Sequence, residues 1–308
     1  MILSASRRTD LPAFYFPWLL RRLQEGFLLV RNPMNPRQVS RVDLSPRLID
    51  GIVFWTKNPL PMLPHLDALG DYPCYFQFTI TPYGPEIEPG LPDKRKEIIS
   101  AFQELSRRIG PRRMIWRYDP IFLSPAYTWK FHLARFREYA RLLAPYAREC
   151  TISFLDYYKC MRKTAGRLDM ERPSPERQAA FAEELASIAR ESGLRLTACA
   201  EALSLAPYGV EPARCVNREI FSELLGVSLP VPKAKGQRPN CGCAESVDIG
   251  AYSSCPNGCL YCYANHSSSA ASPGHDPDSP LLLGRLRPED QVIPRQARSY
   301  ASSQQRLF

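Results

Sequence analysis

Three cysteines near the C-terminal end of the chain, Cys255, Cys259 and Cys262, stand at C-x3-C-x2-C spacing. Three thiolates on one short loop can hold three irons of a cubane cluster and leave the fourth iron open, which a four-cysteine electron-transfer site does not do. An iron that no cysteine binds can take a further ligand and so take part in catalysis. The spacing therefore predicts a [4Fe-4S] cluster on these three residues, with a structural zinc site or unligated thiols as the alternatives.

This short run also resembles the signature of radical S-adenosylmethionine (radical SAM) enzymes, because Tyr261 precedes the third cysteine and Gly258, Tyr263 and Ala264 flank it. In that superfamily, the open iron chelates the methionyl end of S-adenosylmethionine and reduces this cofactor to a 5′-deoxyadenosyl radical. The resemblance implies S-adenosylmethionine as a cofactor. It also implies that Tyr261 packs near the adenine and that Gly258 belongs to the cofactor-binding loop.

A second group of cysteines lies upstream and consists of Cys199, Cys215 and the C-x-C pair Cys241 and Cys243. Four thiolates could close a tetrahedral zinc site or hold an auxiliary [4Fe-4S] cluster. Alternatively, Cys199 and Cys215 are core thiols and the C-x-C pair faces solvent. The sequence leaves these interpretations open.

Short apolar runs that are typical of strands alternate along the chain with amphipathic segments of helix length. The expected strands are Ile2–Ser6, Ile52–Trp55, Cys74–Ile80, Met114–Tyr118, Thr151–Leu155, Leu194–Ala200 and Val247–Tyr252, with Val39–Leu44 as an eighth candidate. The expected helices are Trp18–Glu25, Lys94–Ile109, Thr128–Ala147 and Pro175–Ser192, with Thr128 as an N-cap. This alternation favours an α/β fold in which a parallel sheet closes into a TIM-like barrel.

Polar residues follow most of the expected strands directly, and in parallel α/β barrels the active site lies at these carboxyl ends. We expect four of them to line one mouth as catalytic, cofactor-binding or substrate-binding groups, namely Lys57, Arg117, Asp119 and Glu201. Arg7 and Asn58 are expected to bind the cofactor. Asp10 and Asn58 could instead be helix caps or turn formers.

The length of 308 residues, 44% of them hydrophobic, suits one α/β barrel better than two small domains. We expect a barrel body over residues 1–235, a cysteine-rich segment that completes the barrel over 236–266, and an irregular extension over 267–308. No signal peptide or membrane span is visible after Met1, so we expect a cytoplasmic protein. In that reducing compartment, clustered cysteines are more often metal ligands than disulfides.

The formal net charge of +9 would suit a nucleic acid as partner. However, only eight of the 40 basic residues are lysines, and the arginines are scattered through the chain. A solvated basic surface is therefore favoured over nucleic-acid recognition, and no membrane partner is expected.

Five stretches resemble a family of uncharacterised bacterial proteins that is catalogued as a domain of unknown function: residues 4–10, 53–59, 75–79, 116–120 and 248–252. That family is noted for a C-terminal cysteine cluster similar to the one at the N-terminus of radical SAM domains. The resemblance implies a radical SAM barrel whose cluster loop is displaced in sequence by circular permutation, with Val247–Tyr252 beside Ile2–Ser6. Permutation is reasonable because the first and last strands of a closed barrel are neighbours.

We interpret the sequence as that of a radical SAM enzyme that receives electrons from a reductase, flavodoxin or ferredoxin and acts on a substrate that no motif specifies. A non-catalytic iron–sulfur or zinc protein for electron transfer or sensing is the alternative from a different class. The Tyr261–Ala264 run also resembles that of spore photoproduct lyase, which repairs DNA by radical chemistry, so a lyase-like protein acting on nucleic acid is a further alternative.

Overall fold

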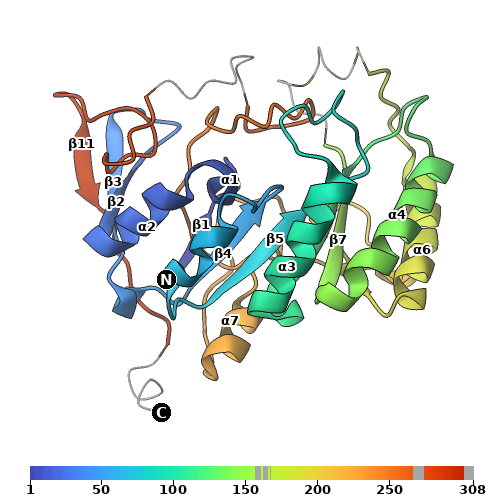
Figure 1. Cartoon of the computed structure of the whole chain (residues 1–308), viewed down its shortest axis with the longest axis horizontal. Coiled ribbons are helices and arrows are strands. Elements are labelled where there is room, and N and C mark those ends of the chain that lie inside the picture. The colour runs from blue at the N-terminus through green and yellow to red at the C-terminus, as the bar shows by residue number, and fades with distance from the viewer. Residues whose placement is uncertain (157–160, 162–165, 167, 266–273, 302–308) are drawn as a thin grey trace.

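A computed structural model describes residues 1–156, 161, 166, 168–265 and 274–301. Its main feature is a sheet of eight parallel strands in the order β10-β1-β4-β5-β6-β7-β8-β9 (Figure 1). The strands are β1 (Ile2–Ala5), β4 (Gly51–Thr56), β5 (Cys74–Thr79), β6 (Met114–Ile121), β7 (Glu149–Phe154), β8 (Arg195–Ala198), β9 (Glu211–Pro212) and β10 (Val247–Asp248). The expected α/β fold with a parallel sheet is confirmed. Closure into a barrel is not shown, because the edge strands β9 and β10 do not pair with each other in the described residues.

A smaller sheet has the order β11-β3-β2 and consists of β2 (Phe27–Arg31), β3 (Gln38–Asp43) and β11 (Gln291–Pro294). The segment expected as an eighth strand of the barrel, Val39–Leu44, lies mostly in β3 and therefore in this second sheet. β11 runs parallel to β3, so the expected irregular extension contributes a strand. Residues 267–273 and 302–308 of that extension lie outside the described part of the chain.

The helices are α1 (Leu11–Phe14), α2 (Phe16–Glu25), α3 (Ile99–Ile109), α4 (Trp129–Leu143), α6 (Pro175–Glu191) and α7 (Arg218–Leu225). Short 3-10 turns are η1 (Pro46–Leu48), η2 (Leu63–Leu69), η4 (Pro111–Arg113), η5 (Ala144–Tyr146) and η7 (Ala206–Tyr208), and η3 (Lys94–Ile98) is a π-turn. All four expected helices are present, and the hydroxyl of Thr128 caps α4 by accepting from the Phe131 amide at 3.2 Å. None of the helices in the described ranges is long and apolar enough to cross a membrane.

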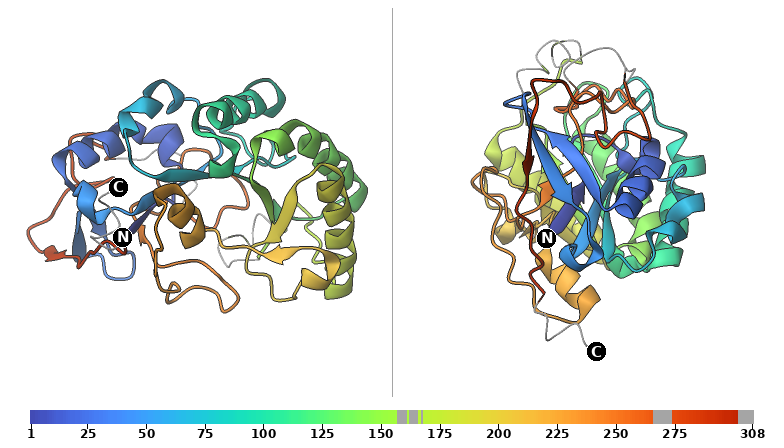
Figure 2. Two further views of the ribbon diagram at one scale, coloured as in Figure 1. Left: turned by 90° about the horizontal axis from the view of Figure 1, so that it is seen from below. Right: turned by 90° about the vertical axis from the view of Figure 1, so that its left-hand side faces the viewer.

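Alternation along the strands gives the large sheet two buried faces, since successive side chains of a strand point to opposite sides. One face packs against the long helices and includes Leu3, Phe54, Phe76 and Trp116. The other packs against α7 and its flanking segments and includes Ile2, Val53, Tyr75 and Ile115. Figure 2 shows the long helices along the outer side of the sheet and α7 on its inner side. The segment that covers this inner face carries three of the upstream cysteines.

Strand β10 lies beside β1 although the two are at opposite ends of the sequence, with Leu3 paired to Val247 and Ser4 to Asp248. The Asp248 carboxylate accepts from the Ser4 hydroxyl at 3.1 Å and from the Arg7 amide at 2.9 Å. The expected extension of this strand to Tyr252 is wrong. The chain packs closely on β1 at Gly250, where a Cβ atom would lie 2.2 Å from Ser6 Oγ. The cysteine loop therefore starts at the carboxyl edge of the sheet.

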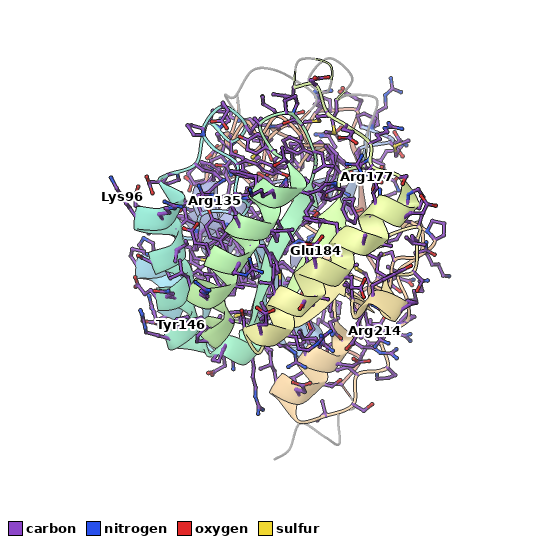
Figure 3. All side chains as sticks on the ribbon, turned by 90° about the vertical axis from the view of Figure 1, so that its right-hand side faces the viewer. Lys96, Arg135, Tyr146, Arg177, Glu184 and Arg214 are labelled. Atoms are coloured by element: carbon purple, nitrogen blue, oxygen red, sulfur yellow. The ribbon has the colours of Figure 1, made fainter. Side chains whose placement is uncertain are left out.

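The outer helical face carries charges of both signs, as the labelled Arg135, Arg177 and Glu184 on α4 and α6 show (Figure 3). Arg135 pairs with Glu138 at 2.6 Å, and Arg177 pairs with Glu171. Much of the basic charge on this face thus has an acidic neighbour. The preference for a solvated basic surface over nucleic-acid recognition stays a prediction.

We predict that Asp248→Ala lowers the free energy of unfolding by about 3 kcal/mol, because it removes a carboxylate that accepts hydrogen bonds from Ser4, Ser6 and Arg7. Urea unfolding followed by circular dichroism measures this change. The exposed Asp71 supplies the control, since Asp71→Ala should change the same free energy by less than about 0.5 kcal/mol. Equal effects of the two substitutions would show that Asp248 does not anchor β10.

Candidate metal centre and its cavity

A cavity of about 460 Å³ opens at the carboxyl edge of the large sheet. Its lining combines both cysteine groups with charged residues from strand ends: Arg7, Lys57, Arg117, Asp119, Cys199, Cys215, Cys241, Cys243, Cys255, Cys259, Tyr261 and Cys262. The fold thus brings to one place residues that are spread over most of the sequence.

The three-cysteine loop (Cys255 to Cys262) is docked on the loop that follows β5. Gly90 donates its amide to the Asn257 carbonyl at 3.0 Å, and Leu260 donates to the Ile87 carbonyl at 2.9 Å. A Cβ atom at position 90 would lie 2.6 Å from the Asn257 Cα, so only glycine permits this approach. Gly258 has a φ of +64°, which explains it as a turn residue. Backbone contacts therefore fix the loop before any ligand is considered.

Burial governs the thiols of this loop. It raises the pKa of Cys255 to about 12, an effect that Asp10 increases. It also raises the pKa of Cys259, although the Lys57 ammonium acts in the opposite direction. Cys259 is electrostatically coupled to both other thiols of the loop, which indicates that the three are near one another. Ionising these thiols requires additional positive charge, and a thiophilic metal supplies it.

Behind the loop lies a buried carboxylate, Glu88, which accepts from Lys57 Nζ at 2.7 Å, from Lys94 Nζ and from the Tyr261 hydroxyl. Thr81 Oγ1 is also 2.9 Å from Glu88. Burial alone would raise the pKa of Glu88, but the two ammonium groups lower it to about 2. This cluster of charges sets the position of Lys57 and links it to the cysteine loop.

Tyr261 is almost fully buried, with 7% of its surface exposed. Its ring lies 5.8 Å from that of Tyr83 and 6.4 Å from that of Phe122, and Lys57 Nζ lies 5.4 Å from its centroid. These aromatic neighbours form a dry wall behind the loop. The edge of Tyr261 that reaches the cavity is small, and its expected contact with adenine stays a prediction.

The four-cysteine group (Cys199, Cys215, Cys241 and Cys243) lines another part of the same cavity. Cys215 Sγ lies 3.4 Å from Cys199 Sγ and accepts from Arg117 Nη1 at 3.0 Å. The Arg117 guanidinium also pairs with Asp119. The alternative in which the C-x-C pair faces solvent does not fit, because Cys241 and Cys243 are both buried.

Three expected site residues lie away from the cavity lining in the described part of the chain: Asn58, Gly258 and Glu201. The Asn58 side chain accepts from the Leu60 amide at 3.1 Å, as a turn former does. Glu201 accepts from the Phe154 amide at 2.9 Å, and burial raises its pKa to about 7. Asp10 caps α1 by accepting from the Ala13 amide at 3.1 Å, in agreement with the cap alternative.

Whether the cysteines fit a metal depends on the kind of centre. Within the described residues, no three Cys, His, Asp or Glu side chains gather as the ligands of a single ion do. Thiolates of a cubane are more widely spaced than those of a single ion, since each binds a different iron. The donor set of the three-cysteine loop, all sulfur and all facing one cavity, fits a cluster of the three-thiolate type.

Glu88 and Lys94 are the site residues that the sequence analysis missed. Glu88 does not directly follow a strand, because a whole loop separates it from the end of β5 at Thr79. A usable signal is the pair of glutamates between two prolines in the run Pro85–Pro89, ahead of the basic run at Lys94. Nothing in that run, however, indicates that it packs against Tyr261.

The fold and the cavity define an α/β protein with a cysteine-lined site at the carboxyl ends of a parallel sheet. The chain belongs to the family described as domain of unknown function (DUF1848), whose model matches residues 2–264. No curated protein and no solved structure matches the chain. The family description gives no activity, so the function must be argued from the site.

The Glu88 cluster predicts a specific pH dependence of stability. The pKa of Glu88 is about 2 in the fold, below the value of about 4.3 for an unfolded glutamate. When folding lowers the pKa of a carboxyl group, that group stabilises the fold at pH values above its unfolded pKa. This stabilisation is lost as the pH falls from the unfolded pKa to the folded pKa. We expect it to contribute about 3 kcal/mol, lost between about pH 4.3 and pH 2.

The measurement is urea unfolding over that pH range, with the Glu88→Gln variant as the comparison. This variant should be less stable at neutral pH by about 3–5 kcal/mol, because two buried ammonium groups lose their partner, and its stability should fall less steeply in acid. The exposed Glu183 provides a Glu183→Gln control that should keep the wild-type profile. Parallel pH profiles for wild type and Glu88→Gln would contradict the assignment.

Proposed function

We propose that this protein is a radical SAM enzyme that holds a [4Fe-4S] cluster on Cys255, Cys259 and Cys262. The observation that carries the proposal is that three thiols of one loop line the wall of a charged cavity. This loop follows β10, a strand at the edge of the sheet. Three thiolates leave one iron for a further ligand. A cavity of about 460 Å³ is in the size range of small-molecule sites.

A [4Fe-4S] cluster held by Cys255, Cys259 and Cys262 and reduced by the electron donor would supply one electron to the sulfonium of S-adenosylmethionine, whose C–S bond would then break to methionine and a 5′-deoxyadenosyl radical. The chain's own residues provide the setting. The Gly90–Asn257 contact holds the loop, and Tyr83, Phe122 and Tyr261 exclude water behind it. Lys57 supplies positive charge near Cys259, and Glu88 holds that ammonium in place.

Arg7 is the best candidate to bind the carboxylate of the methionyl group. Lys57 and Arg117 are each already in an ion pair, with Glu88 and Asp119 respectively. Arg7 lines the cavity, and its buried Nη2 has no hydrogen-bond partner within the described residues. Its guanidinium is held 5.2 Å from the centroid of the Trp55 ring. A guanidinium group recognises a carboxylate through two parallel hydrogen bonds. The expected roles of Lys57, Arg117, Asp119 and Glu201 as ligands stay predictions.

The proposal includes a permuted radical SAM barrel. Support comes from the pairing of β10 with β1, which brings the strand before the cysteine loop next to the first strand of the chain. In this arrangement the cluster loop keeps its place at the sheet edge while its position in the sequence changes. A cytoplasmic location and a reductase, flavodoxin or ferredoxin as electron donor belong to the same proposal.

We predict that Cys255→Ala, Cys259→Ala and Cys262→Ala each lower the iron content by about four atoms per chain after anaerobic reconstitution. Each should also abolish the formation of 5′-deoxyadenosine from S-adenosylmethionine and dithionite. Iron analysis and chromatography of the nucleoside measure the two effects. The buried Cys150, which lies in β7 and outside the cavity lining, gives a matched Cys150→Ala control that should retain both.

Two outcomes would reject parts of this account. A wild-type chain that binds iron on the loop but forms no 5′-deoxyadenosine would favour the non-catalytic iron–sulfur alternative. A colourless chain whose loop carries zinc would reject the cluster.

We also predict that Arg7→Gln weakens the binding of S-adenosylmethionine by about 10–100-fold, because a charged hydrogen bond is worth about 1.5–3 kcal/mol. Equilibrium dialysis with the reconstituted protein measures this affinity. The exposed Arg21 pairs with Glu25 on α2, and Arg21→Gln should leave the affinity unchanged. Unchanged affinity in Arg7→Gln would remove Arg7 from the site.

A further inference from the structure

The four-cysteine group consists of side chains from three separate segments that lie side by side at the inner face. Cys199 follows β8, Cys215 precedes α7, and Cys241 and Cys243 lie on the segment that returns toward β10. The sulfurs are linked in a row. Cys199 and Cys215 lie 3.4 Å apart, Cys215 contacts Cys243, and Cys243 contacts Cys241. Four thiols in mutual contact are more than the packing of small apolar residues requires.

The backbone that carries these thiols is fixed by buried hydrogen bonds. The Cys215 carbonyl accepts from the Tyr75 hydroxyl at 2.7 Å and from Gln77 Nε2 at 2.9 Å. The Ala244 amide donates to the Val216 carbonyl at 2.8 Å, which ties the Cys243 segment to the Cys215 segment. Two polar side chains of β5 thus serve one carbonyl of this group. The backbone at Cys215 is therefore fixed by the sheet.

Two of the four sulfurs have a hydrogen-bond donor beside them. Arg117 is buried, with 5% of its surface exposed. Asp119 accepts from its Nε and Nη2, and its Nη1 donates to Cys215 Sγ at 3.0 Å. The Val216 amide points to Cys243 Sγ at 3.4 Å. Hydrogen bonds from a guanidinium and an amide stabilise thiolate sulfur, and they are a usual feature around sulfur-ligated metals.

We propose that Cys199, Cys215, Cys241 and Cys243 together bind a second metal centre as four thiolates, either one zinc ion or an iron–sulfur cluster. This centre does not depend on the proposed function of the three-cysteine loop. In the structure the four sulfurs form a row and do not surround one point, in line with the lack of single-ion ligand groups among the described residues. Each cysteine side chain has one rotatable bond to its sulfur, so binding of a metal requires rotamer changes within the row.

The test uses the full chain and two multiple variants, one with Cys199, Cys215, Cys241 and Cys243 changed to Ala and one with Cys255, Cys259 and Cys262 changed to Ala. Each protein is incubated anaerobically with iron and sulfide, or separately with zinc, then desalted and analysed for metal by mass spectrometry. The variant that lacks Cys255, Cys259 and Cys262 should retain about four irons or about one zinc per chain. The variant that lacks the four-cysteine group should lose that metal and keep the metal that the three-cysteine loop binds.

Two results would overturn the proposal. One is that the variant lacking Cys255, Cys259 and Cys262 retains neither iron nor zinc. The other is a disulfide between Cys199 and Cys215, detected by mass spectrometry after alkylation of the denatured, unreduced protein. A double Cys74→Ala/Cys150→Ala variant is the matched control, because both thiols are buried in strands and outside the cavity lining. It should bind as much metal as the wild type.

A variant that fails to fold would be recognised by circular dichroism, and the single Cys199→Ala substitution then replaces it. Cys199 is the most exposed of the four thiols, so its removal disturbs the core least. With three remaining ligands, the Cys199→Ala variant should release the second metal to EDTA at least about tenfold faster than the wild type does. An unchanged release rate would contradict a four-thiolate centre.

Discussion

The parallel pairing of β10 with β1 is the constraint on which the site depends. It joins Ser4 to Asp248, which are 244 positions apart in the sequence. Since the carboxyl ends of parallel strands meet at one edge of a sheet, the loop after β10 must lie near the polar residues that follow β1 and β4. Arg7 and Lys57 reach the cavity for this reason, Arg117 reaches it from within β6, and the three cysteines reach it from the other end of the chain.

The two buried faces of the sheet explain why both cysteine groups share one cavity. The long helices cover the outer face, while α7 and the segments around it cover the inner face and carry Cys215, Cys241 and Cys243. Charge within the site is paired locally. Glu88 balances two lysines, and Asp119 balances Arg117. Lys57 and Arg117 therefore have internal partners, whereas Arg7 Nη2 has no hydrogen-bond partner among the described residues.

Periodicity predicted most of the strands and all of the long helices, because their apolar residues repeat with a clear spacing. Thr128, for example, caps α4 as expected. The cysteine spacing likewise grouped Cys255, Cys259 and Cys262, which line one cavity. The sequence could not predict what covers the inner face, since apolar runs such as Ile52–Trp55 show that both faces are buried but not which segment covers them. Nor could it predict Glu88, whose role arises from a loop-to-loop contact with Tyr261, or the strand β11 within a region rich in turn-forming residues.

Electron paramagnetic resonance of the reduced cluster tests the central claim most directly. The sample is the variant that lacks Cys199, Cys215, Cys241 and Cys243, so that only the three-cysteine loop can contribute a signal. If the loop leaves one iron open, adding S-adenosylmethionine should change the g values of the reduced [4Fe-4S] signal, because the ligands of that iron change. A signal that is identical with and without S-adenosylmethionine, or no cluster signal at all, would contradict the account.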